Sequence, residues 1–154
     1  MNTNPSDAEP NPFRRVLPAI ARILLGLIFF VFGLNGFLHF IPQPKDAISP
    51  EAMGFFGELM KTGYMIPLIF ATQTLGGALL LLNRFVPLAL ALLAPVIGNI
   101  ICFHLFLAPS GLPLASFVLL LELYLAWSYR KCYRPMLAFR VRPGADPNPG
   151  GPGQ

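Results

Sequence analysis

Long apolar runs without a charged residue alternate along the chain with short polar segments. Three runs contain no Asp, Glu, Lys or Arg: residues 23–44 and 62–83, of 22 residues each, and residues 85–121, of 37 residues. A helix needs about 20 apolar residues to cross a bilayer, so each of the first two runs holds one span. The third run is too long for one span, and it breaks at the turn signal Pro109-Ser110-Gly111.

This pattern predicts an all-α fold, an integral membrane four-helix bundle. The expected spans are residues 16–38, 64–82, 86–107 and 113–129, within a transmembrane domain at 13–142. Residues 1–12 are rich in proline and residues 143–154 in proline and glycine, so we expect both tails to be disordered. Pro95 lies inside the third span, where it should kink the helix and free a carbonyl that a neighbour must satisfy.

The loop after the first span contains a helix start. Ser49-Pro50-Glu51 combines an N-cap residue, a proline at the first helical position and an acid in the first turn. Apolar residues then recur at helical spacing, and Gly63 is a suitable stop. We therefore expect a short amphipathic helix in the first outer loop. Two interpretations stay open: a lid on the end of the bundle, or a gate over an entrance from the lipid.

The composition and the placement of basic residues give the environment and the orientation. The chain is 55% hydrophobic and 12% charged, whereas soluble domains carry about 25% charged residues. An ordinary water-soluble enzyme is therefore excluded. The first loop holds only Lys45 and Lys61, and the other nine of the 11 basic residues flank the opposite ends of the spans: Arg14, Arg15, Arg22, Arg84, Arg130, Lys131, Arg134, Arg140 and Arg142. The positive-inside rule then predicts cytoplasmic N and C termini. The apolar spans make a lipid bilayer the expected partner. Basic residues spread over helix ends are weak evidence for nucleic-acid binding, so we expect no nucleic acid as a partner.

Ionisable residues inside the hydrocarbon are expensive, so each is a candidate functional residue. At 1.5 Å per residue, Arg22 and Glu122 lie roughly 9 and 10 Å from the inner boundary, and Gln73 lies roughly 14 Å from it. The matching depths predict an Arg22–Glu122 ion pair with Gln73 nearby. That pair could simply pin two helices together, or the three residues could handle a ligand or a proton. Alternatively, Arg22 snorkels to the surface and Glu122 is protonated.

A second polar layer is expected nearer the outside. Asn35 and His39 lie one turn apart on the first span, and Asn99 and His104 lie about 140° apart on the third. Two histidines without a nearby Cys or Asp are a weak metal signal, and we predict no metal site. His104 is therefore either a hydrogen-bonded interior residue or a ligand to a cofactor.

Small residues mark the faces on which the spans should pack. Gly26, Gly33 and Gly36 share a stripe with Arg22, and Gly76 and Gly77 share a face with Gln73. Arg22 and Gln73 should therefore face other helices. The sequence shows no Cys-x-x-Cys, phosphate-binding loop or nucleophile elbow, so catalytic residues cannot be named and whether the protein is an enzyme stays open.

Three motifs together resemble the DoxX family of small bacterial membrane proteins. They are Arg22-x3-Gly26-x2-Phe29-Phe30-x2-Gly33, Gly76-Gly77-x-Leu79-Leu80-x3-Arg84, and His104 in the third span. The resemblance implies a four-helix bundle in the bacterial inner membrane. It also implies a link to thiosulfate:quinone oxidoreduction or to membrane-associated oxidoreductase complexes, with membrane or soluble redox proteins as partners.

The chain departs from the family pattern at two positions. Asn35-Gly36 stands where members often have a lysine, and Gln73 stands where they often have a glutamate. An activity that depends on the family's acidic residue is therefore in doubt. We expect an accessory or non-catalytic subunit of a redox-linked assembly in quinone or sulfur metabolism. The alternatives are a binder or carrier of a small lipophilic molecule, such as a quinone or a lipid, and a purely structural partner protein.

Overall fold

The computed structural model describes residues 13–42 and 49–133, and these residues form helices and no strand. The elements are α1 (Phe13–Leu38), α2 (Pro50–Lys61), α3 (Met65–Leu81), α4 (Val86–Phe106), the 3-10 turn η2 (Pro109–Gly111), α5 (Leu112–Ser128) and α6 (Arg130–Tyr133). Four of these helices occupy the four predicted ranges, with ends that coincide or differ by at most three residues. The predicted tails, 1–12 and 143–154, lie outside the described residues.

Three helical segments are long and apolar enough to cross a membrane: Val16–Leu38, Val86–Phe106 and Pro109–Ser128. The helix α3 has 17 residues, which span about 25 Å and fall short of a hydrocarbon core of about 30 Å. It becomes a fourth candidate if it is counted together with α2, to which it is joined at a bend of 95°. Three or four such helices indicate a multi-pass membrane protein.

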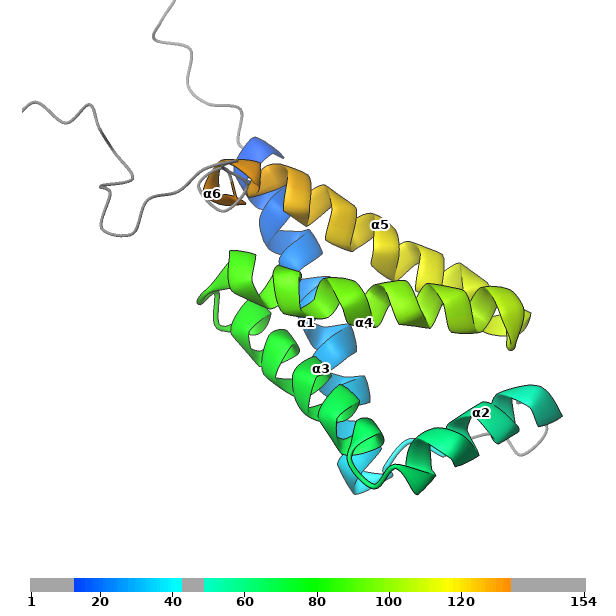
Figure 1. Ribbon diagram of the computed structural model, residues 1–154. Helices are drawn as coiled ribbons and strands as arrows, with labels where there is room; N and C mark the ends of the chain where they lie inside the picture. Colours follow the sequence, from blue (N-terminus) through cyan, green and yellow to red (C-terminus); the bar gives the residue numbers. More distant parts are fainter. Residues whose placement is uncertain (1–12, 43–48, 134–154) are drawn as a thin grey trace, which may run out of the picture.

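The helices form two packed pairs, α1 with α3 and α4 with α5 (Figure 1). The pairs lie close together where α1 begins and α5 ends, which we call the termini end, and they diverge away from it. Leucines and other apolar side chains from all four helices fill the space between the pairs: Leu25, Phe29, Leu80, Leu90, Leu93, Ile97, Val118 and Leu125. Large apolar side chains also cover the outer faces, as expected where lipid replaces water as the solvent.

Glycines bring α1 and α3 into close contact, as the small-residue stripes predict. A Cβ atom on Gly33 would lie 2.6 Å from the backbone nitrogen of Thr74, and one on Gly26 would lie 3.1 Å from the Cβ of Leu80. Because no side chain separates the two backbones, the helices gain dispersion contacts that larger residues would prevent. This interface fixes which face of α1 is turned toward α3.

The short helix α2 forms where the sequence places it and folds against the far end of α4. The hydroxyl of Ser49 accepts from the N–H of Ala52 at 3.2 Å and donates to the carbonyl of Leu107 at 2.9 Å. The rings of Phe55 and Phe56 pack on Phe103, with centroids 5.8 and 5.2 Å apart. These contacts hold α2 across the end of the molecule opposite the termini end (Figure 1), which favours the lid interpretation.

Two glycine-to-alanine substitutions test the α1–α3 interface. Gly33→Ala adds a methyl group where the backbone of α3 stands, so it should lower the stability by about 1–3 kcal/mol. Gly98→Ala on α4 is the matched control, since nothing lies within 4 Å of its Cβ position, and it should be neutral or stabilising. Thermal unfolding in mild detergent measures both. Equal effects of the two variants would contradict the close packing.

Candidate functional site

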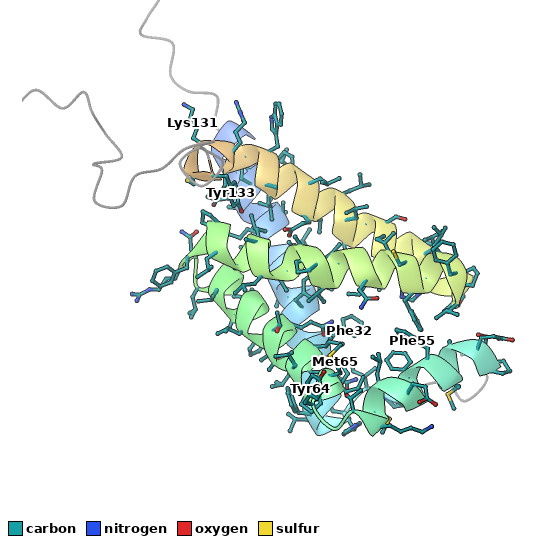
Figure 2. The ribbon with its side chains drawn as sticks, viewed as in Figure 1. Phe32, Phe55, Tyr64, Met65, Lys131 and Tyr133 are labelled. Carbon is teal, nitrogen blue, oxygen red and sulfur yellow. The ribbon has the colours of Figure 1, made fainter. Side chains whose placement is uncertain are left out.

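A pocket of about 240 Å³ lies between α4 and α5, in the half of these helices nearest the termini end. Its walls are mostly methyl and methylene groups, with one carboxyl group and one phenol. The lining residues are Leu90, Ala91 and Ala94 of α4, Glu122 and Ala126 of α5, and Tyr133 of α6. Figure 2 shows Tyr133 at the termini end of the molecule, near the start of α4.

Alanines leave this space open between two otherwise leucine-rich helices. Ala91 and Ala94 are three residues apart on α4, and Ala126 is four residues after Glu122 on α5, so each pair shares a helix face. Where these faces meet, the short side chains do not fill the volume between the helices. The acid at the centre of the pocket therefore borders an apolar space.

The carboxyl group of Glu122 has no partner within the described residues. Its side chain is 5% exposed, and its Oε2 atom is buried without a hydrogen bond. The one ion pair found in residues 13–42 and 49–133 is elsewhere, between Lys61 and Glu58 of α2. A buried polar atom without a partner is costly, and a group of this kind in a membrane protein is a candidate functional site.

The predicted ion pair between Arg22 and Glu122 is wrong. The guanidinium of Arg22 donates instead to the carbonyl of Leu80, in the last turn of α3. This carbonyl also accepts from the N–H of Asn83 at 3.2 Å. Carbonyls at a helix C-terminus carry a partial negative charge, so they attract a cation. Gly26, one turn after Arg22, packs directly on Leu80. Arg22 therefore lies on the face of α1 that meets α3, and its guanidinium bonds to α3 rather than to Glu122.

Gln73 is buried but does not join Glu122. Its side chain is 7% exposed and packs on α1, where its Cβ lies 3.0 Å from the Cβ position of Gly33. It is not among the residues that line the pocket. The predicted cluster of Arg22, Gln73 and Glu122 is therefore divided between two interfaces of the bundle.

The residues of the predicted outer polar layer serve separate local roles. The side-chain oxygen of Asn35 accepts from the N–H of Ile41 at 2.6 Å, and His39 follows α1 in a left-handed conformation with φ of 52°. These two residues end α1. Asn99, in contrast, is exposed on the surface of α4.

His104 closes the turn between α4 and α5. Its Nδ1 atom lies 3.0 Å from the carbonyl oxygen of Ala108, and its ring occupies the space that a Cβ on Gly111 would need. The interior hydrogen-bonded role is therefore the one that the contacts support. Among the described residues no group of three or more His, Cys, Asp or Glu side chains could hold a metal ion.

Tyr133 is the site residue that the sequence analysis missed. Its hydroxyl donates to the carbonyl of Pro87 at 2.8 Å, which ties α6 to the start of α4. Burial, together with the charges of Glu122 and Cys132, raises the pKa of this phenol to about 12. No sequence pattern marks this residue, because the sequence does not show that α6 turns back toward α4.

Comparisons with protein-family models, with curated proteins and with solved structures find no match to this chain.

The separate environments of Arg22 and Glu122 predict that substitutions at the two positions act independently. Arg22→Met removes the cap on α3, and Glu122→Gln removes a charge that no cation contacts. The stability losses or gains should add in the double variant, with a coupling below about 0.5 kcal/mol. Thermal unfolding of the two single variants and the double variant measures the coupling. If the double variant is more stable than the sum of the two single effects by more than this coupling, Arg22 and Glu122 interact, and our assignment of separate environments is wrong.

Proposed function

We propose that this multi-pass membrane protein binds a small lipophilic molecule in the pocket between α4 and α5. The observation that carries the proposal is the orphaned Oε2 atom of Glu122 beside an apolar space. A pocket of about 240 Å³ lies below the usual range of about 300–1,000 Å³ for ligand sites, so it fits a compact molecule or the head of a longer one. The carboxyl group would fix the orientation of this molecule, and the alanine methyl groups would contact its apolar body.

The proposal includes the topology that the charges favour. The chain would cross the bacterial inner membrane four times, through α1, α3, α4 and α5, and α3 would be the shortest of these spans. Both termini would lie in the cytoplasm. The support is that eight of the 11 basic residues belong to the two ends of the chain and to the loop before α4, and that a ninth, Arg22, lies in the half of α1 nearest the N-terminus. Glu122 would then lie in the cytoplasmic half of the membrane, where a ligand could arrive from the lipid.

The structure also bears on the resemblance to the DoxX family, which we retain as a proposal. Residues of the first two motifs meet in one interface: Arg22 bonds Leu80, and Gly26 faces Gly77. The packing of α1 on α3 would therefore explain why both motifs contain small residues at these positions. The pocket at Glu122 lies outside these motifs, so its ligand does not follow from the resemblance.

A second candidate function is an accessory subunit of a redox-linked membrane assembly. The observation that favours it is the exposed amide of Asn99 on the otherwise apolar α4. An amide that faces lipid lacks hydrogen-bond partners, whereas a helix of another protein could supply them. Asn99→Leu should then release co-purifying membrane proteins without affecting a ligand at Glu122.

The binding proposal is tested by filling the pocket. The protein, purified from native membranes in mild detergent, should carry a small lipophilic molecule that native mass spectrometry detects. Ala94→Leu replaces a methyl group with a four-carbon side chain that fills part of the pocket, so the variant should no longer carry this molecule. Ala71→Leu, at an exposed position of α3 outside the lining, should retain it. Equal retention by both variants would contradict the pocket as the binding site.

The topology is tested by cysteine labelling in cells. A cysteine at position 61 in place of Lys61, exposed at the end of α2, should react with a membrane-impermeant maleimide added from outside. Cys132, which follows α5, should react only after the membrane is permeabilised, and Cys102 is replaced by serine to remove its signal. Labelling of Cys132 in intact spheroplasts would overturn the orientation.

A further inference from the structure

Within residues 13–42 and 49–133, the residues that line the pocket at Glu122 offer hydrogen-bond acceptors and no cation. Resting on the binding function proposed above, we propose that its ligand is a lipophilic amine, an apolar molecule whose ammonium group donates to the carboxylate of Glu122. The argument depends on which polar atoms border the pocket, on where the neighbouring cations are engaged, and on the apolar character of the walls.

Three groups at the pocket can accept hydrogen bonds. The Oε2 atom of Glu122 is buried without a donor. The hydroxyl of Tyr133 gives its single hydrogen to Pro87, so for any further partner it has only lone pairs. The carbonyl of Ala91 loses its i+4 donor because residue 95 of α4 is proline, which has no N–H. A ligand with several N–H donors on one atom matches this set.

Two cations of the described part of the chain are engaged elsewhere, so we assign the positive charge to the ligand. Arg22 donates to Leu80 on α3, and Arg130 donates to the carbonyl of Trp127 and lies 4.6 Å from the centre of its ring. None of the described residues that line the pocket is Lys, Arg or His. A charge in an apolar environment interacts strongly with an opposite charge, since little water screens it.

The remaining walls favour an apolar body beside the ammonium group. Leu90 and three alanines supply hydrocarbon surface, and the pocket is open on one side, so a longer chain can extend into the lipid. A neutral alcohol would satisfy one acceptor and supply no positive charge. A ketone or quinone presents carbonyl oxygens, which are acceptors themselves, and would pair with none of the three groups unless Glu122 were protonated.

The test uses three ligands with the same compact hydrocarbon cage: 1-adamantanamine, 1-adamantanol and 2-adamantanone. Their binding to the full-length protein in phosphatidylcholine nanodiscs is measured by calorimetry at pH 7, with empty nanodiscs subtracted. The amine should bind at least about tenfold more tightly than the alcohol, because a hydrogen bond to a charged group is worth more than a neutral one. The ketone should bind most weakly.

Charge-neutralising variants assign the effect to the pocket. Glu122→Gln should lower the affinity for the amine by at least about tenfold and the affinity for the alcohol by less than about threefold. Glu51→Gln, at an exposed position of α2, changes the net charge equally and should leave both affinities unchanged. Size-exclusion profiles identical to that of the unsubstituted protein establish that the variants are folded.

The outcomes separate this inference from the binding function on which it rests. If the three ligands bind equally and Ala94→Leu removes all of them, the pocket binds lipophilic molecules but the preference for an amine is overturned. If none binds and Ala94→Leu changes nothing, both proposals fail. If phosphatidylethanolamine in the nanodiscs displaces the amine, the ammonium group belongs to a lipid headgroup, and a free amine as the ligand is overturned.

Discussion

The close contact of α1 with α3 determines where the charges of this bundle can go. Gly26 and Gly33 allow the two backbones to approach until no side chain fits between them. Arg22 lies on the same stripe, so this contact carries its guanidinium to the end of α3, where the carbonyl of Leu80 accepts it. A single steric constraint thus packs two helices and also satisfies the cation of the membrane interior.

The same constraint leaves the carboxyl group of Glu122 without a cation among the described residues. Arg22 is the only basic residue inside the predicted spans, and its bond to α3 turns it away from α5. On the other side of the bundle, alanines at positions 91, 94 and 126 keep a space open beside the acid. Glu122 and these alanines are separate features in the sequence, and the packing of the helices places the buried carboxyl beside the apolar pocket.

The helices of this fold could be predicted because charged residues, turn residues and capping residues mark their ends. Uncharged runs bounded the spans, and Ser49 with Pro50 marked the start of α2, since capping depends only on neighbouring residues. The partner of Arg22 was predicted wrongly because depth along a helix gives one coordinate and leaves the direction around the axis open. The glycine stripe contained that direction, as Gly26 lies one turn from Arg22 and faces Leu80. Tyr133 was missed because its contact with Pro87 depends on a chain reversal after α5.

The central claim is that Glu122 serves a ligand and not the fold, and one stability measurement tests it most directly. Glu122→Met replaces the carboxyl with an apolar side chain of similar length, and its unfolding free energy is compared with that of the unsubstituted protein after removal of lipids and ligands. A residue whose buried oxygen has no partner contributes a penalty, so the variant should be equally stable or more stable by about 1–3 kcal/mol. A loss of about 3–5 kcal/mol, as when a buried ion pair is broken, would contradict the account, because Glu122 would then have a partner within the protein.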